Sequence, residues 1–210
     1  MSRARRIPTG FTLAFALSAA LGACGGNDGA QDRDAITRTL RVGLSATDAD
    51  VLCDATLSTA LQTRVYGSPE RCTEVETRSA PTRTPPTGVL VSDVRVDGDH
   101  ATAIVGLRGN GMDSVRGGVR LVREDGGWRL DDLSTAFLRT SFNAGLDGGG
   151  TLEGTLVVCV GTKIRGLDDA AMRRLAFGSM GGRPEARVQL RQFVAECVDA
   201  LNAPASGDTA

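Results

Sequence analysis

The chain has 210 residues, of which 41% are hydrophobic and 23% are charged, and its formal net charge is −1. A protein that binds nucleic acid needs a basic surface to neutralise phosphates, so this balance of charges argues against a nucleic-acid partner. A single histidine and the lack of closely spaced cysteine pairs argue against a metal site, and no cofactor-binding motif is present.

The N-terminal segment has the layout of an export signal. A basic start is followed by an apolar run over residues 11–21, then by two small residues and Cys24. This layout is similar to a bacterial lipoprotein signal peptide, and the run is shorter than the roughly 20 residues of a membrane-spanning helix. The resemblance implies that residues 1–23 are removed and that lipidated Cys24 anchors the chain to the membrane on its extracytoplasmic face. Residues 24–30 are then expected to form a flexible tether.

Two helices are expected before any strand. In residues 31–44, apolar residues recur every three or four positions, as they do on one face of a helix. Thr47 is a suitable N-cap for a second helix, which the apolar pattern extends to Val65 and which Gly67 ends. Cys72 is expected in the loop after this helix.

The cysteines after Cys24 are Cys53, Cys72, Cys159 and Cys197. An even number of cysteines outside the cytoplasm indicates disulfides, and four cysteines can pair in three ways. Pairing by proximity, Cys53 with Cys72 and Cys159 with Cys197, would staple each half of the chain. Loop-closure entropy assigns about 3 to 4 kcal/mol of stabilisation to each such bridge.

A proline-containing connector over residues 80–88 separates the helices from a different pattern. Short runs rich in β-branched residues follow, separated by glycine-containing turns. Runs joined by short turns predict an antiparallel meander, and helices followed by such a sheet make an α+β domain. The predicted strands are residues 89–96, 101–107, 115–123 and 128–133.

Three features of this region resemble a known superfamily. They are the hairpin over residues 94–103, the closing segment over residues 119–133 with its Gly-Gly-Trp-Arg-Leu sequence, and the cysteines Cys53 and Cys72. They resemble the NTF2-like superfamily, which includes SnoaL-like polyketide cyclases and ketosteroid isomerases, and more narrowly the small actinobacterial lipoproteins that carry such a domain. The resemblance implies that in residues 31–138 N-terminal helices pack on a curved antiparallel sheet in a cone. It also implies a homodimer through the open sheet face, unless the C-terminal helices cover that face.

The remaining chain is expected to form a small helical domain with its own disulfide. The glycine-rich residues 139–150 are interpreted as a linker, residues 151–202 as three short helices, and residues 203–210 as a disordered tail. The first helix is ambiguous, because its valines suit a strand equally well. Asp168 is expected to cap the next helix and Pro184 to open the last one.

Three side chains are candidates for chemistry. His100 follows a tight turn, where a side chain is usually in water, but inside a cone it would serve as a general base. Asp93 is an acid in an otherwise apolar strand, and it either faces water at a sheet edge or is a buried base. Tyr66, the only tyrosine, lies at a helix end. No Gly-x-Ser-x-Gly motif indicates a serine nucleophile.

These observations favour a lipid-anchored, non-enzymatic envelope protein whose NTF2-like domain binds a small apolar ligand or another protein. The alternative is a SnoaL-like cyclase or an isomerase that acts on a small apolar ring substrate, and it rests on the resemblance alone. A deep cavity with Asp93 or His100 inside it would favour the enzyme, and solvent exposure of both residues would argue against it. A cone filled by its own side chains would instead indicate an interaction module.

Overall fold

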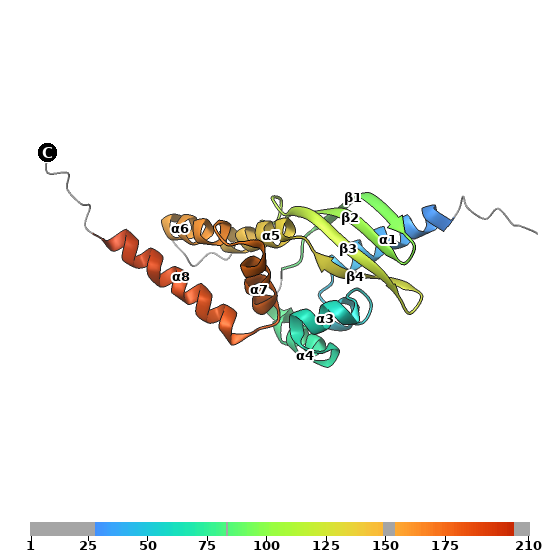
Figure 1. Cartoon of the computed structure of the whole chain (residues 1–210), viewed down its shortest axis with the longest axis horizontal. Coiled ribbons are helices and arrows are strands. Elements are labelled where there is room, and N and C mark those ends of the chain that lie inside the picture. The colour runs from blue at the N-terminus through green and yellow to red at the C-terminus, as the bar shows by residue number, and fades with distance from the viewer. Residues whose placement is uncertain (1–27, 83, 149–153, 204–210) are drawn as a thin grey trace, which may run out of the picture.

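The computed structural model describes residues 28–82, 84–148 and 154–203 (Figure 1). The predicted signal peptide, the lipidation site Cys24 and residues 204–210 of the predicted tail lie outside these residues. In the described part of the chain, no helix combines the length and hydrophobicity needed to cross a bilayer. The fold is α+β, with helices around a four-stranded antiparallel sheet.

The sheet is the predicted meander. Its strands follow one another in space in chain order, and each pair is antiparallel. At the last turn Asp125 and Gly126 have φ angles of 52° and 75°, the left-handed conformation that a tight hairpin requires. The strands are β1 (Gly88–Asp97), β2 (His100–Arg108), β3 (Arg116–Glu124) and β4 (Gly127–Leu133), within one residue of the prediction at each end.

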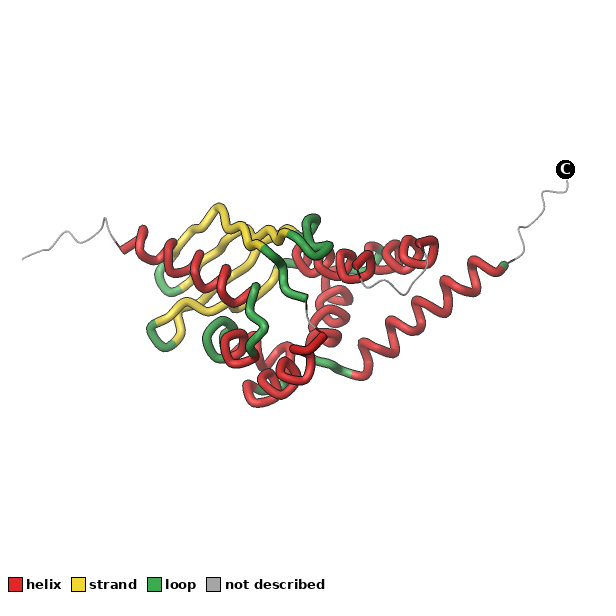
Figure 2. The backbone as a smooth tube through the Cα atoms, turned by 180° about the vertical axis from the view of Figure 1, so that it is seen from behind, coloured by secondary structure: helices red, strands yellow, loops and turns green. Residues whose placement is uncertain are grey.

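Helix α1 (Asp28–Leu44) covers one face of the sheet, which we call the inner face (Figure 2). Alternate residues of β2, from Ala101 to Leu107, are buried on this face, as the alternation predicts. Ile36 and Leu40 of α1 are completely buried. The helix begins within the predicted tether, so the prediction of a flexible segment was wrong for its last residues, Asp28–Ala30.

Two short helices, α2 (Ala49–Cys53) and α3 (Thr59–Tyr66), replace the single second helix that was predicted. The chain breaks between them because residues 56–58 pair with β4: the Ser58 N–H donates to the Leu130 carbonyl, and the Leu130 N–H donates to the Thr56 carbonyl. The Ser58 hydroxyl then accepts from the Leu61 N–H and caps α3. The N-cap of α2 is Asp48, one residue after the predicted Thr47.

Cys72 lies in helix α4 (Pro69–Ser79), not in a loop. Ser68 caps this helix through its hydroxyl. Pro69 occupies the first turn, where a backbone N–H has no acceptor within the helix and its absence is not destabilising. The disulfide between Cys53 and Cys72 joins α2 to α4, as predicted. A short 3₁₀ helix, η1 (Ala80–Thr82), leads into the predicted connector.

Most of the predicted linker is helical, because residues 139–148 belong to helix α5 (Thr135–Gly148). The Ser134 hydroxyl accepts from the Phe137 N–H at its start, and Phe137, Leu138 and Ala144 are buried. The helix lies close against β3 at Gly117, where an added Cβ would stand 2.6 Å from the Phe137 backbone nitrogen. Burial of these apolar side chains outweighs the unfavourable glycines in the second half of the helix.

The remaining helices are α6 (Gly154–Arg165), α7 (Asp169–Met180) and α8 (Pro184–Asn202). The ambiguous first segment is thus helical, and both predicted helix starts are confirmed: Asp168 caps α7, and Pro184 begins α8. The predicted disulfide between Cys159 and Cys197 joins α6 to α8. Among the described residues, no helix lies over the outer face of the sheet, so the C-terminal helices leave that face open (Figure 1).

Trp128 anchors the end of the sheet to α1. It is 3% exposed, its indole N–H donates to the Asp32 carboxylate over 3.0 Å, and the Arg123 guanidinium lies 4.6 Å from its ring centre. Hydrogen bonds from Trp128 and Arg123 lower the pKa of Asp32. This cluster holds the first turns of α1 against β3 and β4.

Candidate functional site

A cavity of about 810 Å³ lies between the inner face of the sheet and the helices. It extends between the end of α1, the α2–α4 helices and α5, and the connector before β1 contributes to its wall. At Gly43, an added Cβ would stand 2.1 Å from the Thr56 side chain, so α1 can only end this close to the α2–α3 loop because it carries a glycine there. The helices therefore line the cavity without filling it, and it remains open to solvent on one side.

The wall of the cavity is mostly apolar. Leu57, Leu61 and Val65 line it from the α3 side, and several of its wall side chains belong to the buried core of the protein. From the sheet and α5 it is lined by Leu107, Val115, Leu130, Leu133, Phe137, Leu138 and Ala144. Such a wall favours a ligand that buries apolar surface.

Several polar residues interrupt this apolar wall, among them Thr84, Asn110 and the buried pair Tyr66 and Glu76. The Tyr66 hydroxyl donates to the Glu76 carboxylate over 2.5 Å, and both side chains are buried. Ser141 of α5 also lines the cavity, and among the described residues its buried hydroxyl has no hydrogen-bond partner. The Ser141 Oγ itself has almost no accessible surface, so this hydroxyl lies behind the wall and does not face the cavity.

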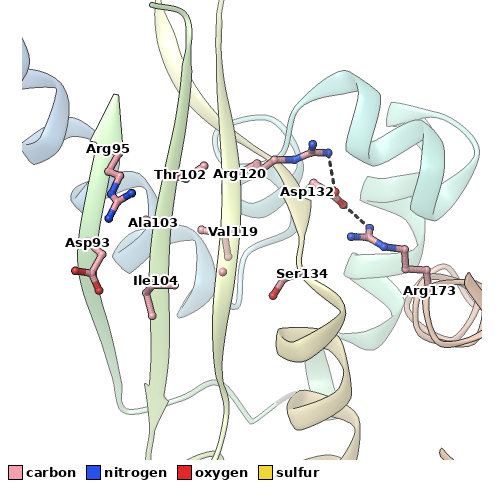
Figure 3. Close-up of a pocket in the computed structure, with 11 residues that line it drawn as sticks. Asp93, Arg95, Thr102, Ala103, Ile104, Val119, Arg120, Asp132, Ser134 and Arg173 are labelled. Atoms are coloured by element: carbon pink, nitrogen blue, oxygen red, sulfur yellow. Dashed lines mark hydrogen bonds and ion pairs between the residues drawn. The ribbon is translucent and has the colours of Figure 1, made fainter. Parts of the chain in front are cut away.

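A second hollow lies on the outer face of the sheet, and we call it the outer groove (Figure 3). Its volume is about 730 Å³. Short residues of β2 and β3, among them Thr102 and Gly118, form its floor. Its walls are Asp93 and Arg95 of β1 on one side and Arg120, Asp132, Ser134 and Arg173 on the other.

Asp132 organises one wall of the outer groove. Its carboxylate, which is 9% exposed, accepts from Arg120 over 2.7 Å and from Arg173 over 2.8 Å, one arginine on each oxygen (Figure 3). Burial raises the pKa of Asp132, but the hydrogen bond and charge of Arg173, helped by the charge of Arg120, outweigh this effect. The pKa therefore lies below its ordinary value of 3.8.

The three candidate residues do not lie together. Tyr66 lines the cavity. Asp93 and His100 are exposed on the outer side of the sheet, where Asp93 lines the outer groove and His100 lines the adjoining hollow. Asp93 faces water on the edge strand β1, where it lies at a β-bulge with a φ of 54° that was not predicted.

Sequence reasoning missed three features of these sites. Glu76 was not considered because α4 was not expected, although the Ser68-Pro69 pair is a helix-start signal. Ser141 lay in the segment interpreted as a linker. Asp132 was missed although the adjacent Asp131 and Asp132 interrupt the alternation between Leu130 and Leu133, which is the signal of the bulge in β4. Within the described ranges, no group of three potential metal ligands comes together.

Comparison with known proteins leaves the family open: no protein-family model, no curated protein and no solved structure matches this chain.

Proposed function

We propose that this chain is a lipid-anchored, extracytoplasmic binding protein with an NTF2-like domain that holds a small apolar ligand in the cavity between the sheet and the helices. The observation that carries the proposal is the cavity itself. Its volume of about 810 Å³ falls within the roughly 300–1,000 Å³ of small-molecule sites, and its wall is apolar. The helices packed on the inner face of a meander support the NTF2-like interpretation.

The wall also indicates the kind of ligand. An apolar body would contact the leucines of α3, β4 and α5. Any polar atom of the ligand would have to face the few polar residues of the wall, such as Thr84 and Asn110. We therefore expect a neutral, mainly hydrocarbon molecule.

The proposed location rests on two features. The disulfides are compatible with an oxidising, extracytoplasmic compartment. The segment ending in Cys24 supports attachment by lipid, and two or more acyl chains would make the anchor stable. Mass spectrometry of the chain from membranes should find an N-terminal Cys24 with a diacylglycerol mass. A diacylglycerol modification that persists in a Cys24→Ala variant would contradict this part of the proposal. So would a wild-type chain that retains residues 1–23.

Ligand binding can be tested with the neutral fluorescent probe N-phenyl-1-naphthylamine. We expect saturable binding with a rise in probe fluorescence. Ala144→Phe should weaken this binding at least tenfold, because Ala144 is 5% exposed and lines the cavity, so a phenyl ring there would take up ligand space. Ala136→Phe is the matched control, since Ala136 is exposed on the same helix.

Equal binding by both variants, at unchanged thermal stability, would contradict the proposal that the cavity is the ligand site. The exposure of Asp93 and His100 argues against the enzyme alternative, because neither residue lines the cavity, whereas Tyr66 lines it together with Glu76.

A further inference from the structure

The register of the sheet sets four polar side chains in one row across the outer face. Arg95 of β1 is directly opposite Thr102 of β2, Thr102 is opposite Arg120 of β3, and Arg120 is opposite Asp132 of β4. Residues that are directly opposite in antiparallel strands point to the same face. The row crosses the outer groove, and Figure 3 shows its side chains rising from the sheet.

Two β-bulges create this row. The register shifts between Ser92 and Arg95, so β1 has one residue more than β2 there. Without this extra residue, Val94 would lie opposite Thr102. The second shift, between Arg120 and Leu121, brings Asp132 opposite Arg120 and leaves Asp131 as the extra residue of β4. Bulges re-aim side chains, and here both edge strands use one to place a charged residue on the outer face.

The spacing suits a small group held between two arginines. Neighbouring strands are about 4.8 Å apart, so the Cα atoms of Arg95 and Arg120 are separated by about 10 Å across β2. Thr102 lies between them and is exposed, so that its short side chain leaves room for a ligand between the two long ones. Both arginines also line the adjoining hollow of about 500 Å³, so they stand where the two hollows meet.

Acidic residues stand on both sides of the arginine pair, so the free guanidinium donors, and not an excess of positive charge, make the site. Arg95, Arg120 and Arg173 line the outer groove with Asp93 and Asp132, and Asp97 and Asp131 line the adjoining hollow. Asp132 is shared by two guanidinium groups, each of which keeps further N–H donors. Arg95 is exposed, and within the described residues its side chain forms no ion pair or hydrogen bond. The guanidinium donors of Arg95 and Arg120 are therefore available to a ligand.

We propose that the outer groove binds a small molecule through a carboxylate or phosphate group held between Arg95 and Arg120 above Thr102. A guanidinium presents parallel N–H donors that match both anionic groups. Asp132 positions Arg120 for this contact and Asp93 disfavours a second anionic group at the β1 wall. The site is independent of the apolar cavity, since it lies on the opposite face of the sheet.

The test is a titration of the full oxidised chain, followed by NMR of the arginine side-chain Nε–H groups. Inorganic phosphate and succinate are the two probes, with chloride held constant. We expect saturable shifts of the Arg95 and Arg120 signals with at least one probe. Arg95→Gln should weaken the affinity at least tenfold and Thr102→Val less. Arg38→Gln is the matched control, because Arg38 is exposed on α1, away from the outer face.

Three results would overturn the proposal: no saturable shift with either probe, shifts spread evenly over exposed arginines, or equal weakening by Arg95→Gln and Arg38→Gln. Arg95 is exposed, so its replacement should leave the melting temperature unchanged. Thr102→Val provides a second variant in the same row. Saturation by phosphate alone or by succinate alone would support the site and identify which anionic group it prefers.

Discussion

The two faces of the sheet have the same backbone and opposite chemistry. On the inner face, Ala103 and Val105 are buried under helices, and a large apolar cavity remains. On the outer face, Thr102 and Arg120 are exposed in an open groove. The period of two along each strand separates the faces, but it does not decide whether the space on the buried side is filled. Filling depends on how closely the helices approach their neighbours. Helix α1 comes close to the α2–α3 loop at Gly43, and α5 comes close to β3 at Gly117.

The largest expected difference between the faces is in stability. Leu121→Ala on the inner face should lower the free energy of unfolding by about 2–5 kcal/mol, because Leu121 is 1% exposed and its loss leaves a void. Thr102→Ala, at the outer-face residue of β2 that follows the Leu121 partner Ala101, should change the free energy of unfolding by less than about 0.5 kcal/mol. Urea unfolding measures both, and comparable losses would mean that the outer face is packed in solution.

A smaller and pH-dependent effect is expected for Asp132→Asn. This change removes the charge shared by Arg120 and Arg173, and it should cost about 1–3 kcal/mol at pH 7. The pKa of Asp132 is lowered in the folded state, so its contribution is complete above its unfolded value of 3.8 and is lost as the pH falls through the folded value.

Unfolding of wild type and Asp132→Asn should therefore be compared at pH 7 and below pH 3.8. The two stabilities should converge in acid. A difference that stays constant over this range would show that Asp132 contributes through packing and not through its charge.

The smallest expected effect is on the inner face and has the opposite sign. Ser141→Ala should raise the free energy of unfolding by up to about 1 kcal/mol, since it removes a buried hydroxyl without a partner and alanine favours a helix. Thr140→Ala is the control, because the Thr140 hydroxyl donates to the Ala136 carbonyl within the same helix. Destabilisation of the ligand-free protein by Ser141→Ala would show that the hydroxyl already has a partner in solution.

The sequence predicted the parts of the fold that local rules determine. All four strands, the turn with Asp125 and Gly126, the caps at Asp168 and Pro184, and both disulfides follow from alternation, turn residues, helix-start residues and cysteine number. Except for the disulfides, whose cysteines are 19 and 38 residues apart and were paired by proximity in sequence, each of these signals lies within a few residues of the feature that it determines.

Features that depend on contacts distant in sequence were missed. The break between α2 and α3 arises because residues 56–58 pair with β4, far along the chain. Helix α5 forms because Phe137 and Leu138 pack into the core, although its glycines favour a linker. The row from Arg95 to Asp132 depends on two bulges, and a shift of one residue in register is not visible in composition. Both candidate sites therefore depend on packing and register.

The measurement that tests the central proposal most directly is a crystal structure of the oxidised protein under xenon pressure, because xenon enters apolar cavities that stay empty of water. The proposal predicts xenon between Leu130, Leu133 and Phe137, with these side chains in place and no xenon in the outer groove. An inner face collapsed onto the helices, with its own side chains filling this space and no bound xenon, would contradict it.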